Sequence, residues 1–193
     1  MRPQIKIFVQ LDFPSARWPG FSRLAEWLAG VRGACDRWFV EPSISRSTEL
    51  AADPEVVWAI VTDLPNMGDL SPENVGGRWV GGATGPALGA RFRGVNRKGR
   101  KQWWTRVLVT DCEPPRWFAF DVRSSFGMRV SRWAYEITPT ATGCVLTEHW
   151  YRVGNKFVQR YLGPIVTGQP DRPGFNAYSM EHTLAAVARK VAA

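Results

Sequence analysis

The sequence predicts an α+β fold in which a curved antiparallel sheet of about seven strands wraps around a long C-terminal helix. Three observations lead to this prediction. A short strand pattern precedes a well-signalled helix, a series of alternating strand patterns fills the middle of the chain, and an amphipathic helix closes it. No helical pattern interrupts the strand series, so we expect consecutive strands to pair antiparallel. A sheet and one long helix arranged in this way enclose apolar space.

The first elements of this domain are a strand and two short helices. Apolar and polar residues alternate over Ile44–Ala51, which is typical of a strand. A helix is expected over Asp53–Asp63, because an aspartate suited to the N-cap is followed directly by a proline suited to the first helical position. Pro65 ends this helix, and a second short helical turn is expected at Asn66–Leu70.

The strand series that follows has turn signals at hairpin intervals. Glycine pairs, a Lys-Gly step, a Pro-Pro step and a Thr-Gly step separate the alternating segments. The expected strands are Val75–Val80, Ala90–Asn96, Gln102–Thr110, Trp117–Arg123, Arg129–Thr138 and Cys144–Tyr151.

The C-terminal part is predicted to be helical in two pieces. The first covers Lys156–Thr167, and a glycine and two prolines then interrupt the helical pattern. The second covers Phe175–Val191, in which Asn176, Met180 and Leu184 lie on one side at helical spacing.

Side-chain alternation assigns one face of each strand to the interior. The inward faces are rich in aromatic residues, which suit the walls of a cavity. The expected ligand-binding residues are Met67, Trp79, Phe92, Asn96, Trp103, Thr105, Phe118, Phe120, Trp133, Tyr135, Glu148, Trp150, Asn176, Met180 and Leu184.

Glu148 is an acid on this otherwise apolar set of positions. A buried carboxylate is costly unless it is paired, so Glu148 is either a group that orients a ligand or the partner of an arginine or of Trp N–H groups. Asn176 similarly contacts a ligand or forms a helix-to-strand hydrogen bond. Glu148, Glu73 and Tyr135 are the candidates for acid–base chemistry, because burial can bring a carboxyl pKa close to neutrality.

Residues 1–43 are interpreted as an extension with an amphipathic helix at about residues 21–39. One interpretation is that this helix packs on the main domain or on a partner subunit, which includes a homodimer formed through it. The other is an interfacial membrane helix, which its mixture of acidic and basic residues matches poorly.

The chain carries a formal net charge of +8, and a run of basic residues without an acid extends from Arg91 to Arg106. This run falls on an expected hairpin, where charged side chains are normally solvated. Nucleic-acid binding is therefore disfavoured, whereas transient contact with an anionic membrane surface remains a hypothesis. Three cysteines without a pairing pattern, and an N-terminal apolar run too short for a signal peptide, indicate a cytoplasmic protein.

Several catalytic classes lack their motifs in this sequence. The two histidines are not part of a metal-ligand pattern, so no metal is expected. The chain has no nucleophile elbow, phosphate-binding loop or dinucleotide fingerprint, and no cofactor is expected.

Several stretches together resemble the START-like, or Bet v 1-like, helix-grip superfamily (SRPBCC), and within it the polyketide cyclase/dehydrase and lipid-transport group. The resemblance covers about residues 44–191 and leaves the extension unexplained. Its stretches include Asp53-Pro54-Glu55-Val56-Val57-Trp58, Val61-Thr62-Asp63-Leu64, Ser71-Pro72-Glu73-Asn74, Gly77-Arg78-Trp79, Gly89-Ala90-Arg91-Phe92, Trp133-Ala134-Tyr135-Glu136 and Met180-Glu181.

The resemblance implies a deep apolar cavity between the sheet and the last helix. The resulting expectation is binding of a hydrophobic small molecule or lipid without catalysis. The alternative is a polyketide cyclase, aromatase or dehydratase that uses acid–base groups in the cavity. The resemblance assigns no catalytic residue, because no matching position lies in a catalytic motif.

Overall fold

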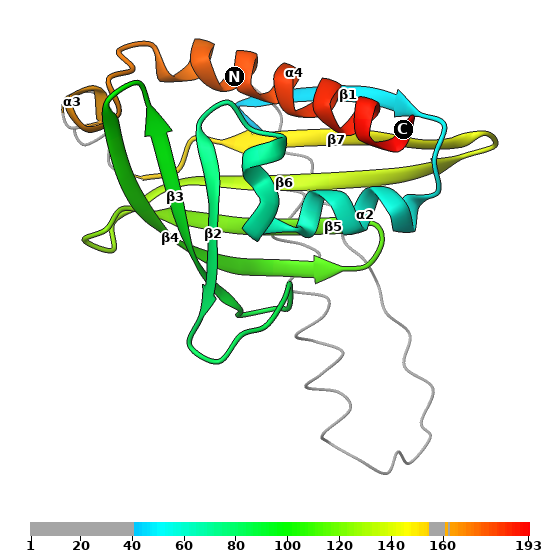
Figure 1. The fold of residues 1–193 in the computed structure, drawn as a ribbon, viewed down its shortest axis with the longest axis horizontal. Helices are drawn as coiled ribbons and strands as arrows, with labels where there is room; N and C mark the ends of the chain where they lie inside the picture. The colour runs from blue at the N-terminus through cyan, green and yellow to red at the C-terminus, as the bar shows by residue number, and fades with distance from the viewer. Residues whose placement is uncertain (1–40, 155–160, 162) are drawn as a thin grey trace, which may run out of the picture. The chain divides into compact units, whose positions relative to one another are not determined.

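The computed structural model describes residues 41–154, 161 and 163–193, which form a seven-stranded antiparallel sheet covered by helices (Figure 1). The strand order is β1-β7-β6-β5-β4-β3-β2. The strands are β1 (Ile44–Leu50), β2 (Asn74–Val80), β3 (Arg91–Lys98), β4 (Lys101–Glu113), β5 (Trp117–Arg123), β6 (Arg129–Thr140) and β7 (Gly143–Tyr151). The helices are α2 (Pro54–Thr62), the 3-10 helix η1 (Leu64–Asp69), α3 (Gly163–Thr167) and α4 (Arg172–Val191). The predicted fold class and strand order along the chain are confirmed.

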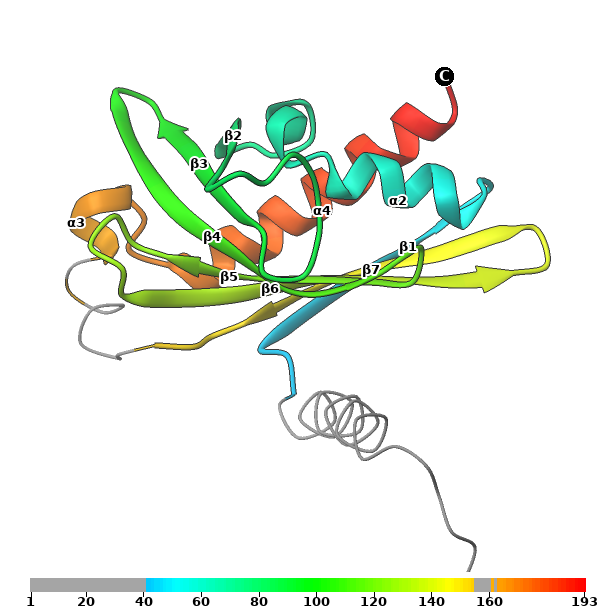
Figure 2. The same ribbon diagram turned by 90° about the horizontal axis from the view of Figure 1, so that it is seen from below.

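Both longer helices lie on the same face of the sheet (Figure 2). Helix α4 packs mainly on β1, and α2 packs on β6 and β7. The contact buries Val57 and Val61 of α2 and Val187 of α4, each with 0 % exposure. Burial of such side chains is worth roughly 1.5–3 kcal/mol each, so this interface accounts for much of the fold's stability.

The strand register confirms the predicted inward faces. Tyr135 of β6 lies opposite Phe118 of β5 on one side and Glu148 of β7 on the other. Trp133 in turn lies opposite both Phe120 and Trp150. Because facing residues of paired strands share a face, these side chains form one continuous surface toward the helices.

Several elements extend beyond their predicted bounds, β4 and α4 by three residues at one end. Strand β4 continues to Glu113 because a register shift between Val109 and Asp111 lets it keep pairing with β5. Helix α4 begins at Arg172, ahead of the predicted Phe175, since Pro173 is accommodated in the first turn, where no N–H donor is needed. The Asp171 carboxylate caps this turn by accepting from Gly174 N at 3.0 Å.

Some predicted features lie outside the described residues. These are the N-terminal helix at about residues 21–39 and all of the predicted Lys156–Thr167 helix except Tyr161 and α3. None of the described helices combines the length and the apolar character that a membrane span requires.

The start of β2 depends on glycine. Gly76 has φ +101°, and a Cβ atom at this position would overlap with the carbonyl oxygen of Pro65 in η1. Replacing Gly76 with alanine should therefore lower the free energy of unfolding by roughly 3 kcal/mol or more, because a strained φ and a backbone clash add.

Gly82→Ala is the matched control for this prediction. Gly82 also has a positive φ of +82°, but apart from its chain neighbours no atom lies within 4 Å of the position that a Cβ atom would occupy. Gly82→Ala should therefore lower the free energy of unfolding by only about 1–2 kcal/mol. Urea denaturation of both variants measures the difference. Equal losses would show that the approach of η1 to β2 is not the constraint.

Candidate functional site

The face of the sheet that points toward α2 and α4, here called the inner face, changes character along the strands. At one end Phe118, Ile137 and Leu146 are fully buried, with exposures of 0–2 %. At the other end Trp103, Thr105 and Trp133 point the same way but are only half-buried. The candidate site is the region between these two ends.

Aromatic rings pack against one another along this surface. Trp79 and Phe92 have ring centroids 5.2 Å apart, and Phe118 lies 5.6 Å from Phe120. Trp58 of α2 adds a further ring 5.9 Å from Phe118, a contact that was not predicted from the sequence. The signal that could have indicated it is the place of Trp58 in the apolar run of its helix, three residues before the buried Val61.

Glu148 lies within this apolar surface and is 3 % exposed. Its Oε1 accepts a hydrogen bond of 3.1 Å from the hydroxyl group of Tyr135, which is itself 4 % exposed. Arg46 lies opposite Glu148 in the register of β1, yet its guanidinium binds Glu181 of α4 at 3.0 Å instead. The predicted pairing of Glu148 with an arginine or a Trp N–H is therefore wrong, and its partner is a tyrosine.

Burial raises the pKa of Glu148 to about 8, and the hydrogen bond from Tyr135 offsets only part of this rise. The same burial, reinforced by the neighbouring Glu148, raises the pKa of Tyr135 well above its usual value. At pH 7 the Glu148 carboxyl group is therefore mostly protonated and can donate a hydrogen bond.

Two buried polar atoms of β7 have no hydrogen-bond partner among the described residues. They are Oε2 of Glu148 and Nε1 of Trp150, two residues apart on the inner face. A buried group left without a partner costs roughly 1–3 kcal/mol. Both groups can act as donors, so an oxygen atom of a bound molecule could accept a hydrogen bond from either.

Helix α4 contributes three of the predicted residues from the opposite side. Asn176, Met180 and Leu184 are all buried, with exposures of 2 %, 0 % and 4 %. The amide group of Asn176 forms no hydrogen bond with any described residue, so the expected helix-to-strand bond is not found in this part of the chain. Ligand contact by Asn176 stays a prediction.

Glu73 is held by a bidentate ion pair. Arg172 at the start of α4 donates to Oε1 at 2.6 Å and to Oε2 at 2.5 Å, and Glu73 is 7 % exposed. Both carboxylate oxygens are occupied by one guanidinium group, a geometry that favours attachment of α4 to the start of β2 over proton transfer. A catalytic role of Glu73 stays a prediction.

The lysines of the β3–β4 hairpin hold the segment around α3. Lys101 Nζ donates to the carbonyl oxygen of Ile165 at 2.7 Å, and Lys98 Nζ to that of Gly168 at 3.4 Å. Part of the basic run is therefore bound within the domain.

The remaining predicted residues have structural contacts. Asn96 Nδ2 lies 3.4 Å from Thr105 Oγ1, and Met67 packs into the core from η1. His149 points to the outer face, where it contacts Ser45 and Glu136. Over residues 41–154, 161 and 163–193, no three His, Cys, Asp or Glu side chains are grouped so that they could hold a metal ion.

Comparisons with known proteins agree with this architecture. The family model described as "Polyketide cyclase / dehydrase and lipid transport" matches residues 41–188. A Polyketide_cyc-like protein from Corynebacterium glutamicum is 28% identical, with a TM-score of 0.53, and the match covers 77% of this chain and 90% of that one. A search of curated proteins finds no match to this sequence.

Two further solved structures share the fold at 12% identity. A protein from Chromobacterium violaceum has a TM-score of 0.58, with 77% of this chain and 95% of that chain covered. The di-domain ARO/CYC protein StfQ of the steffimycin biosynthetic pathway has a TM-score of 0.59, with 88% of this chain and 60% of that longer chain covered. At this identity the likeness shows the fold alone.

The raised pKa of Glu148 predicts a pH-dependent stability. Below the ordinary pKa of 4.5 the carboxyl group is protonated in both the folded and the unfolded chain, so it contributes no difference. As the pH rises toward 8 the unfolded chain ionises and the folded chain does not, so the wild-type protein loses stability. Glu148→Gln keeps an acceptor for Tyr135 and should become more stable than wild type as the pH increases from about 5 to 9.

Denaturant unfolding at several pH values measures this effect. Glu49→Gln, at an exposed position of β1, serves as the control and should follow the pH dependence of the wild type. Parallel curves for wild type and Glu148→Gln would contradict the protonated state of Glu148.

Proposed function

The chain belongs to the polyketide cyclase / dehydrase and lipid transport family, and we propose that it binds a hydrophobic small molecule or lipid on the inner face without catalysing a reaction. The family description covers both carriers and enzymes, so the choice between them depends on the side chains of this chain. The aromatic inner face supports an apolar ligand, since aromatic rings offer large contact areas for such molecules.

The observation that carries the proposal is the pair of unpartnered groups on β7. Oε2 of Glu148 and Nε1 of Trp150 are buried without partners among the described residues, and the carboxyl group is mostly protonated at neutral pH. The two donors suit an otherwise apolar ligand that carries a single carbonyl or hydroxyl group. A carboxylate ligand would suit the site less, because burial disfavours a charge there.

The distribution of acids supports binding over catalysis. Glu73, Asp121 and Glu148 are the buried acids of the described residues. Glu73 is clamped by Arg172, and Asp121 is bound by Arg129 at 2.8 Å. Among the described buried acids, Glu148 therefore has no second unpaired carboxyl group to act as a base. Without such a base, a proton that Glu148 gives to the ligand can only return to Glu148.

A polyketide cyclase, aromatase or dehydratase is the second candidate. It is favoured by the pKa of Glu148 of about 8, which is close to the value that a general acid needs at neutral pH. In this role Glu148 would protonate a ligand carbonyl oxygen while Tyr135 stabilises the resulting carboxylate.

Replacement of Trp150 by phenylalanine tests the binding site, because it removes the indole N–H and keeps an aromatic ring. Binding of a fluorescent fatty alcohol to the purified protein should weaken roughly fivefold, the effect of one hydrogen bond of about 1 kcal/mol. Trp104→Phe makes the same change on the outer face of β4 and should leave the affinity unchanged.

Two results would contradict the proposal. One is equal affinity of Trp150→Phe and wild type, together with no apolar molecule in native mass spectra of the purified protein. The other is chemical conversion of a poly-β-ketone probe by wild type that stops in Glu148→Gln, which would establish the enzymatic candidate.

A further inference from the structure

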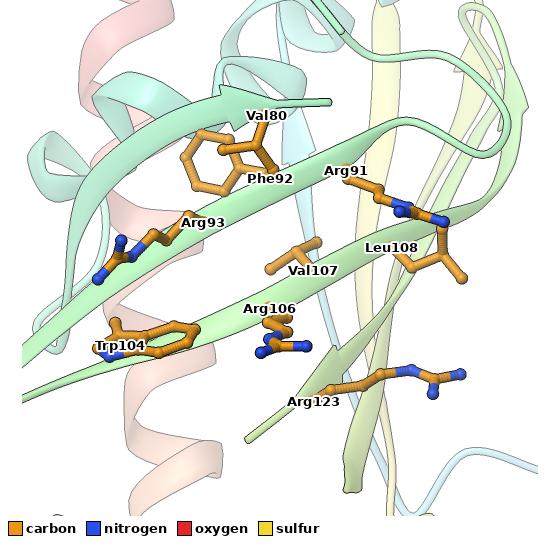
Figure 3. A pocket seen from close by; sticks show the side chains of 9 residues that line it. All are labelled: Val80, Arg91, Phe92, Arg93, Trp104, Arg106, Val107, Leu108 and Arg123. Atoms are coloured by element: carbon orange, nitrogen blue, oxygen red, sulfur yellow. The ribbon is translucent and has the colours of Figure 1, made fainter. Parts of the chain in front are cut away.

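The outer face of the sheet carries a groove of about 470 Å³ across β3, β4 and β5 (Figure 3). Val80, Trp104 and Leu108 supply its apolar side chains, and Arg91, Arg93, Arg106 and Arg123 its charged ones. Phe92 and Val107 also line it, but their side chains are buried on the inner side of β3 and β4. The groove is separate from the candidate site, which lies on the other face of the same strands.

The four arginines of the groove have no acidic partner among the described residues. Elsewhere on the same face, arginines are neutralised: Arg129 binds Asp121 at 2.8 Å, and Arg132 binds Asp111 at 2.5 Å. Asp121 and Asp111 thus balance the arginines of β6. The excess of positive charge lies on β3, β4 and the end of β5, and the exposed Arg78 of β2, opposite Arg93, adds to it.

Two of these arginines contact the ring of Trp104. The guanidinium of Arg93 lies 4.4 Å from the centre of its ring, and that of Arg106 lies 5.6 Å from it. The two arginines face each other in the register of β3 and β4, an arrangement of like charges that costs free energy unless an anion offsets it. Cation–π contacts with the Trp104 ring hold both guanidinium groups close together despite their mutual repulsion.

We propose that this groove binds a phosphate-bearing ligand, either a phosphate or a diphosphate ester. Guanidinium groups bind phosphate oxygens in bidentate geometry, and a group with two or more negative charges offsets several arginines at once. A single carboxylate would leave most of the charge uncompensated. The apolar lining formed by Val80 and Leu108 offers contact area for the organic part of such an ester.

A nucleic-acid strand fits this surface less well. Single strands bind on exposed aromatic rings that stack with bases, but the ring of Trp104 is already covered by guanidinium groups. Lys98 and Lys101 of the hairpin donate to carbonyl groups near α3, so neither ammonium group is free to follow a nucleic-acid backbone.

Isothermal titration with sodium pyrophosphate at low ionic strength tests the proposal. Wild type should bind pyrophosphate saturably and should not bind acetate at the same ionic strength. The double variant Arg93→Gln/Arg106→Gln should lose affinity roughly tenfold or more, because two charge-assisted hydrogen-bonding groups are removed. Arg189→Gln/Lys190→Gln removes the same charge from α4 and should bind as wild type does.

A single variant, Arg123→Gln, distinguishes loss of binding from loss of folding. It should unfold at the wild-type temperature and still weaken pyrophosphate binding. Vesicles of phosphatidylcholine with and without phosphatidic acid separate the two sources of phosphate: cosedimentation that depends on Arg93 and Arg106 assigns a lipid headgroup, and pyrophosphate binding without cosedimentation assigns a free phosphate ester.

Three results would overturn the proposal. The first is an equal loss of pyrophosphate affinity in the groove variant and in the α4 control. The second is acetate binding as strong as pyrophosphate binding. The third is a much tighter complex with a thymidine oligonucleotide than with pyrophosphate. The groove variants should leave binding of the fluorescent fatty alcohol on the inner face unchanged, so this test is independent of the proposed function.

Discussion

A sheet with one apolar face requires a cover, and in this domain α2 and α4 provide it. Side chains alternate along each strand, and the two helices pack on the inward side chains of β1, β6 and β7. Glu148 occupies one of these positions at 3 % exposure. Its desolvation, only partly offset by Tyr135, keeps the carboxyl group neutral and makes it a hydrogen-bond donor in apolar surroundings.

The same alternation gives the two faces of the sheet opposite chemistry. On β4, Thr105 and Val107 point inward, whereas Trp104 and Arg106 point outward into the arginine-lined groove. The inner face disfavours charge and the outer face concentrates it. An apolar ligand with a single polar group suits the first, and a multiply charged anion suits the second, so one sheet could hold two different ligands without competition.

Alternation and turn signals were enough to predict the fold class and the inward residues, because both are local properties of the chain. They also singled out Glu148. The partner of Glu148 could not be predicted, since it depends on how β6 and β7 align and on the pairing of Arg46 with Glu181. The groove was missed for the same reason: its arginines come from three strands whose alignment the sequence does not specify. Ligand binding by the predicted inner-face residues stays a prediction.

The chemistry of the inner face depends on Glu148 being a neutral acid inside the domain at physiological pH. Infrared difference spectra of wild type and Glu148→Gln, recorded as a pH titration, observe the carbonyl band of a protonated carboxyl group directly. We expect a band at pH 7 that is absent from Glu148→Gln and that disappears with a midpoint near pH 8. A difference band that has already disappeared by about pH 5, as for an ordinary solvated glutamate, would contradict the neutral state.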